Sequence, residues 1–144
     1  IINRIKGNFI NQHDIDIISD YQISIFDNDV IFNERNSENP FYNKIKIYNF
    51  KTKKIEEYLP EYIKKYKPTT ITSGSHHIDK KNGIYIEDNN NGRLFYLDKE
   101  GNLLWEYINK SKDNKIFRLS WFKVIEDKSK IIYYKKLFKS DTLC

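Results

Sequence analysis

Three histidines and the polar residues beside them are the side chains of this chain best suited to chemistry. His13 lies between Gln12 and Asp14, and His76 and His77 form an adjacent pair further along the chain. An imidazole has a pKa near 6.5, so it is largely neutral and nucleophilic at neutral pH. We therefore take His13 as the candidate chemical centre. The alternative is a structural histidine that only hydrogen-bonds the backbone at the start of a strand.

A small, hydroxyl-rich segment leads into the histidine pair. Thr72 and Ser73 are candidate contacts for an anionic group, and His76 and His77 are candidates for the same site as His13. The alternatives are loop hydroxyls that satisfy the backbone and an exposed histidine pair. Three histidines without convergent carboxylate spacing do not predict a metal site. The chain also lacks a glycine-rich phosphate loop and a Ser-His-Asp set.

Composition predicts a β-rich domain. The chain has 144 residues, of which 39% are hydrophobic and 15% aromatic, and it contains no alanine. Aromatic and β-branched residues favour strands, and alanine is the best helix former. The net charge is +5, but lysines alternate with acidic residues along the chain, so we expect no nucleic-acid partner. No stretch reaches the roughly 18 apolar residues that a membrane span needs.

Cysteine usage excludes two kinds of structure. Cys144 is the single cysteine, so neither an internal disulfide nor a cysteine-based zinc site is expected. The chain begins at Ile1 without a signal peptide, which indicates a piece of a longer protein.

Short alternating segments predict strands that position these residues. Turn-forming residues such as Asn82-Gly83 separate them. Pro60 to Pro68 is expected to be a short helical turn or an extended connection, since a proline lies at each end. The expected strands lie near His13–Ile18, Ile23–Asn28, Asn43–Phe50, Lys54–Leu59, His77–Asp79, Ile84–Asp88, Arg93–Asp98 and Leu103–Tyr107.

The strand plan occurs twice. Ile23–Asn28 parallels Ile84–Asn89, so the pair Asp27-Asn28 corresponds to Asp88-Asn89. Tandem four-stranded antiparallel units are typical of β-propeller blades. We expect an all-β partial propeller of one domain, with units at about 13–59, 76–107 and 116–138. The third unit would place strands at 116–125 and 131–137, and Trp105 and Trp121 are expected in the core. Propellers need about four to eight blades, so a fragment would leave sheet edges unsatisfied.

These residues resemble the bacterial arylsulfotransferase family, whose members are β-propeller enzymes. The similarity extends over roughly His13 to Val124. The elements that carry it are Gln12-His13-Asp14, Ile25-Phe26-Asp27-Asn28, Ile55-Glu56-Glu57-Tyr58, Ile71-Thr72-Ser73, Gly92–Asp98 with Gly101, and Leu104-Trp105-Glu106-Tyr107.

The resemblance implies transfer of a sulfuryl group from an aryl sulfate to a phenol without the nucleotide donor PAPS. His13 takes the place of the family's sulfated histidine, and Asp14 or Gln12 is expected to fix its tautomer. Thr72, Ser73, His76 and His77 are further candidates for substrate contacts. No cofactor is implied. The partners are a small aryl sulfate and a phenol, and the family's enzymes tend to work outside the cytoplasm.

The chain departs from the family pattern in one respect. The family's His-x-Asn and Arg-His elements have no counterpart here and would lie before Ile1. Since the transferred group is anionic, it needs cationic or N–H donors. We therefore expect this fragment to be inactive alone. The rival hypothesis is a non-catalytic propeller that serves as a binding or interaction module. The oligomeric state does not follow from the sequence.

Overall fold

Two four-stranded antiparallel sheets make up most of the protein. A computed structural model describes residues 5–30 and 41–140. In each sheet every strand pairs with the next one in the chain. The first sheet contains β1 (Gln12–Ser19), β2 (Gln22–Asp27), β3 (Lys44–Asn49) and β4 (Ile55–Glu57), and the second contains β5 (Ser75–Ile78), β6 (Ile84–Asp88), β7 (Arg93–Leu97) and β8 (Leu103–Ile108). The predicted β-rich fold with two four-stranded antiparallel units is confirmed.

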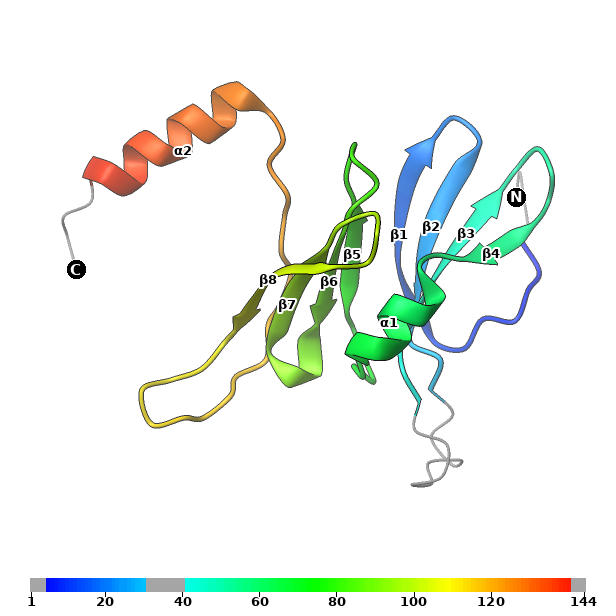
Figure 1. Ribbon diagram of the computed structural model, residues 1–144, viewed down its shortest axis with the longest axis horizontal. Helices are drawn as coiled ribbons and strands as arrows, with labels where there is room; N and C mark the ends of the chain where they lie inside the picture. The colour runs from blue at the N-terminus through cyan, green and yellow to red at the C-terminus, as the bar shows by residue number, and fades with distance from the viewer. Residues whose placement is uncertain (1–4, 31–40, 141–144) are drawn as a thin grey trace.

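The two sheets share one hydrophobic core. Helix α1 (Pro60–Tyr66) joins β4 to the second sheet and contributes Ile63 to this core. Strands β1 and β5, the first strand of each sheet, lie side by side (Figure 1). The core therefore forms where the face of one sheet meets the other. Its buried members are Phe26, Ile45, Ile63, Ile84, Ile86, Phe95 and Leu97.

Strand β1 has its polar residues on the side that faces the rest of the protein. Asp14 and Asp16 are half-buried, whereas Ile15 and Ile17 are 59% and 83% exposed. The alternation correctly predicts a strand, because successive side chains point to opposite faces. The apolar face of β1, however, is open in the described part of the chain, and the acidic face points toward β5.

The C-terminal part differs from the prediction. Residues 116–125 form no strand beyond a bridge between Lys110 and Ile116, and residues 131–137 lie in helix α2 (Lys128–Ser140). Asp127 caps this helix, because its Oδ1 accepts hydrogen bonds from the backbone N–H groups of Ser129 (2.8 Å) and Lys130 (3.1 Å). The predicted strands of a third unit are therefore wrong for these residues.

Helix α2 stands apart from both sheets (Figure 1). No helix within the described ranges is long and apolar enough to cross a membrane. The expected core position of the tryptophans is also wrong, since Trp105 and Trp121 are both exposed. Cys144 and most of the loop between β2 and β3 lie outside the described residues.

The shared core makes Phe26 a test of how the sheets are coupled. Its side chain is fully buried. We expect Phe26→Ala to lower the free energy of unfolding by about 3–5 kcal/mol, because truncating a buried phenylalanine to alanine removes apolar contacts and leaves a cavity. Guanidinium denaturation measures the change. Phe138→Ala, at an exposed position of α2, is the matched control and should change stability by less than about 0.5 kcal/mol. Equal effects of the two substitutions would contradict a shared core.

Candidate active site

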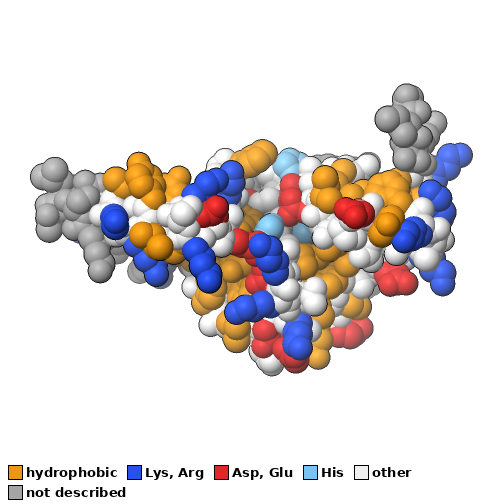
Figure 2. Space-filling model, turned by 90° about the horizontal axis from the view of Figure 1, so that it is seen from above, with side chains coloured by type: hydrophobic (Ala, Val, Ile, Leu, Met, Phe, Trp, Pro, Cys, Tyr) orange, Lys and Arg blue, Asp and Glu red, His pale blue; other side chains and the backbone are white. Residues whose placement is uncertain are grey.

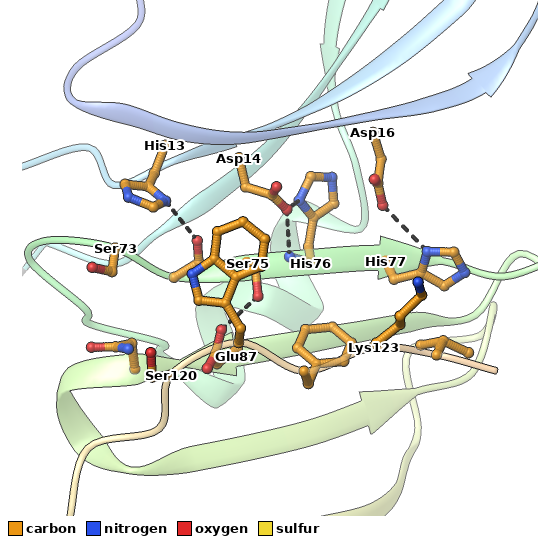
Figure 3. Close-up of a pocket in the computed structure, with 15 residues that line it drawn as sticks. His13, Asp14, Asp16, Ser73, Ser75, His76, His77, Glu87, Ser120 and Lys123 are labelled. Atoms are coloured by element: carbon orange, nitrogen blue, oxygen red, sulfur yellow. Dashed lines mark hydrogen bonds and ion pairs between the residues drawn. The ribbon is translucent and has the colours of Figure 1, made fainter.

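A cavity of about 350 Å³ lies where β1, β5 and residues 120–124 converge (Figure 3). In Figure 2 histidine side chains reach the surface near the middle of the molecule, beside acidic side chains. The cavity therefore combines imidazoles, carboxylates and aromatic rings. Its lining consists of His13, Asp14, Asp16, Ser73, Gly74, Ser75, His76, His77, Glu87, Asn89, Ser120, Trp121, Phe122, Lys123 and Val124.

His13 projects from an irregular point in β1. The register of β1 against β2 shifts between Gln12 and Asp14, so His13 has no partner of its own in the ladder. Its Nδ1 lies 3.1 Å from the carbonyl oxygen of Gly74. A carbonyl only accepts hydrogen bonds, so Nδ1 carries a proton, and in the neutral ring Nε2 then keeps its lone pair. The tautomer is thus set by a backbone carbonyl of the segment before β5, and neither Gln12 nor Asp14 contacts the ring nitrogens.

Buried amides hold the Gly74 carbonyl in place. The Nδ2 group of Asn28 donates to the carbonyls of Thr70 (3.1 Å) and Ser73 (2.9 Å), and Nδ2 of Asn43 donates to Thr70 at 2.8 Å. Buried polar groups are costly unless they are hydrogen-bonded, so these contacts lock the segment to the end of β2. Asn28, one member of the repeated pair Asp27-Asn28, therefore supports the segment that contains Gly74, whereas Asp27 accepts hydrogen bonds from the backbone of Ile10 and from Lys46.

Two Asp–His contacts connect β1 to β5 (Figure 3). Oδ2 of Asp14 lies 3.1 Å from Nδ1 of His76 and accepts the backbone N–H of His76 at 3.0 Å. Oδ2 of Asp16 lies 3.3 Å from Nδ1 of His77. Burial of Asp14 raises its pKa, but the contacts with His76 outweigh burial and hold the pKa below its usual value. Alternate residues of the two neighbouring strands thus form a ladder of Asp–His contacts.

Glu87 is a cavity residue that the sequence reasoning did not single out. It is only 2% exposed, and its Oε2 accepts a hydrogen bond from the Ser75 hydroxyl at 2.5 Å. Its Oε1 is buried and has no hydrogen-bond partner among residues 5–30 and 41–140. The repeat in the sequence contains a signal for Glu87. Glu87 precedes Asp88-Asn89 as Phe26 precedes Asp27-Asn28, so a carboxylate occupies the repeat position of a core phenylalanine.

The structure brings together five of the seven predicted site residues. His13, Asp14, Ser73, His76 and His77 line the cavity. Gln12 is exposed and pairs with Asp27 at the end of β1. Thr72 is also exposed, and its backbone N–H donates to Oδ1 of Asn90 at 3.2 Å, as expected of a loop residue that satisfies the backbone. In the described part of the chain, no group of three or more His, Cys, Asp or Glu residues is arranged to hold a metal ion.

The dependence of the His13 tautomer on Gly74 is testable by substitution. Gly74 has a φ of +95°, and a Cβ there would lie 2.6 Å from Cγ2 of Thr70 and 2.8 Å from the ring of Phe26. Gly74→Ala should therefore displace the carbonyl and move the His13 proton from Nδ1 to Nε2, which ¹⁵N NMR of the imidazole reports. Gly101→Ala, at φ +79° in a distant turn, is the matched control. An unchanged His13 spectrum in Gly74→Ala would contradict this account.

The Asp14–His76 contact predicts a pH dependence of stability. Because the contacts with His76 hold the pKa of Asp14 in the folded protein below the usual value of an aspartate, ionised Asp14 stabilises the fold above that usual value, and this contribution is lost as the pH falls through the lowered pKa. Asp14→Asn should therefore destabilise the protein above about pH 5 and differ less from wild type near about pH 3. Thermal unfolding across this range measures the difference. Asp20→Asn, in an exposed turn, should show no such trend.

Comparison with known proteins agrees with the resemblance in the sequence. The family model described as arylsulfotransferase (ASST) matches residues 4–110, which include both sheets, His13 and the β5 histidines. No significant match was found among curated proteins or among solved structures. Since the matched range is well over half of the 144 residues, this chain belongs to the arylsulfotransferase (ASST) family.

Proposed function

We propose that the chain is part of a β-propeller arylsulfotransferase in which His13 is the nucleophile. The arrangement of the two sheets supports this. β1 and β5 lie side by side as inner strands of neighbouring blades would, and residues 120–124 line the cavity beside β5. The same anchor occurs in both units. Nδ2 of Asn28 donates to the carbonyls of Thr70 and Ser73 before β5, and Nδ2 of Asn89 donates to the carbonyl of Leu119 before residues 120–124.

The observation that carries the proposal is the hydrogen bond between Nδ1 of His13 and Gly74. It leaves the lone pair of Nε2 free to attack the sulfur of an aryl sulfate. The bond between sulfur and the phenolic oxygen breaks, and the phenolate leaves. The product is an Nε2-sulfohistidine whose ring still carries the Nδ1 proton and is cationic. The Gly74 carbonyl stabilises this ring, since hydrogen bonds to charged donors are stronger than those to neutral ones.

The second half-reaction reverses the first with a new phenol. The acceptor oxygen attacks the sulfur, the N–S bond breaks, and the electron pair returns to Nε2. The acceptor's proton passes to water and balances the proton that the departed phenolate takes up, and His13 is again neutral with its proton on Nδ1. A cationic imidazole ring is a good leaving group, so the carbonyl that orients His13 serves both half-reactions.

The sulfuryl oxygens are negative and need cationic or N–H donors, and the cavity lining contains few cationic side chains. Among the described residues, Lys123 is the single lysine or arginine in the cavity lining, which also contains Asp14, Asp16 and Glu87. We propose that further cationic and N–H donors come from parts of the natural protein beyond residues 1–144, and that the chain alone does not turn over. The three acidic residues of the lining disfavour an anionic substrate, so they also favour the rival proposal of a binding module without catalysis.

The enzyme proposal is tested in the full natural protein that contains this chain. After incubation with an aryl sulfate, we expect a mass gain of one sulfuryl group on the peptide that holds His13. His13→Asn should abolish the mass gain and lower kcat/KM by at least about a thousandfold, because it removes the attacking group. Ser19→Ala, at the other end of β1, is the control. Phenol release that is unchanged in His13→Asn would leave the binding module as the better account.

A further inference from the structure

We infer that helix α2 binds the surface of a lipid bilayer that contains anionic lipids, and that it lies along this surface. The inference goes beyond the proposed function and does not depend on His13 or on sulfuryl transfer. Three features carry it, namely the charge of the helix, an apolar stripe along it and a basic hollow beside it. The helix itself does not line the cavity between the two sheets.

The helix is basic along its whole length. Residues 128–140 include five lysines and no aspartate or glutamate, whereas basic and acidic residues are mixed over the rest of the chain. The two acidic residues just before the helix already have partners. Asp127 caps the helix, and a carboxylate oxygen of Glu126 lies 3.4 Å from the amine of Lys80. Helix α2 therefore carries a net positive charge that suits an anionic surface.

Apolar and basic side chains alternate around the helix in a defined order. At 3.6 residues per turn, Ile131, Tyr134 and Phe138 fall on one stripe. Lys130 and Lys135 fall on opposite sides of this stripe. Phe138 is 80% exposed, and the helix stands apart from both sheets (Figure 1). Lysines that border an apolar stripe can lay their stems along it and place their amines at the level of lipid headgroups.

A hollow of about 350 Å³ lies between α2 and the segment that precedes it. Two lysine amines and two tyrosine rings meet there, and the described residues of its lining include no carboxylate. Tyr133 and Tyr134 contact each other edge to face, with 5.5 Å between ring centroids. Amines and phenolic hydroxyls are hydrogen-bond donors that suit the phosphate of a lipid headgroup. The lining of this basic hollow consists of Lys123, Ile125, Ser129, Lys130, Tyr133 and Tyr134.

The composition of the helix favours a bilayer over an acidic protein. Lysine is depleted in protein–protein interfaces, whereas lysine on the polar face and aromatic residues on the apolar face are typical of helices that lie in the bilayer interface. Tyrosine is also enriched at the level of the headgroups. A helix of 13 residues is about 20 Å long, which is shorter than the roughly 30 Å hydrocarbon core. Helix α2 therefore suits a position along the surface.

Vesicle co-sedimentation of the full natural protein tests this inference. The probes are phosphatidylcholine vesicles with and without phosphatidylglycerol. The protein should bind at least about tenfold more tightly to the anionic vesicles, and added salt should weaken this binding. Lys130→Gln combined with Lys135→Gln should lower the affinity for anionic vesicles about thirtyfold, because each lysine near the surface contributes to binding. Phe138→Ala should lower it about tenfold, because it removes a buried ring from the lipid.

Matched substitutions elsewhere in the chain separate the helix from total charge and total apolar surface. Lys99→Gln combined with Lys112→Gln removes two lysines from exposed turns, and Phe117→Ala removes an exposed ring outside the helix. Both control variants should bind anionic vesicles as the unmodified protein does. Circular dichroism establishes that every variant is folded.

Soluble polyglutamate is the probe for the alternative of an acidic protein partner. We expect it to bind more weakly than the anionic vesicles, because it offers charge but no apolar phase for the stripe. The inference is overturned by equal binding to neutral and anionic vesicles, by absence of vesicle binding, or by a control pair as damaging as the helix pair. Polyglutamate binding as tight as vesicle binding, together with an unchanged vesicle affinity in Phe138→Ala, would also overturn it. Sulfation of His13 enters none of these outcomes.

Discussion

The buried side chain of Asn28 joins the two sheets and places the cavity between them. Its Nδ2 group donates to two carbonyls of the segment before β5, and its own backbone carbonyl accepts from Nδ2 of Asn43 at 2.9 Å. In a buried setting each of these bonds is hard to replace with water, so the segment has one favourable position. The position of this segment fixes the Gly74 carbonyl, and the carbonyl in turn orients the His13 ring.

The strand β1 shows how a sheet edge can serve chemistry and packing at once. Its acidic residues meet the histidines of β5, while the hydrophobic contact between the sheets is made one strand further in, by Phe26 and the aliphatic residues of β6 and β7. The Asp–His contacts between β1 and β5 therefore do not have to supply the hydrophobic packing between the sheets. The two contacts differ in burial, because the His76 side chain is fully buried whereas those of His77 and Asp16 are partly exposed, so the Asp14–His76 contact carries the larger desolvation cost.

Much of the scaffold could be predicted from alternation and turn residues, because both act over a few neighbouring residues. The proximity of His13 to His76 and His77 followed from the repeat. The role of Gly74 did not, because a backbone carbonyl leaves no trace in side-chain pattern. Glu87 was missed because an acidic residue in a strand usually faces solvent. Residues 131–137 of helix α2 are rich in β-branched and aromatic side chains, which predict a strand, and the cap at Asp127 is a weaker signal in the sequence.

The correspondence between Phe26 and Glu87 has a consequence for how such a protein diversifies. The two residues occupy one position of a repeated unit, yet the phenylalanine fills the core and the glutamate borders a cavity. One position of the repeated unit can therefore hold an aromatic ring or a carboxylate, according to whether it faces the shared core or the cavity.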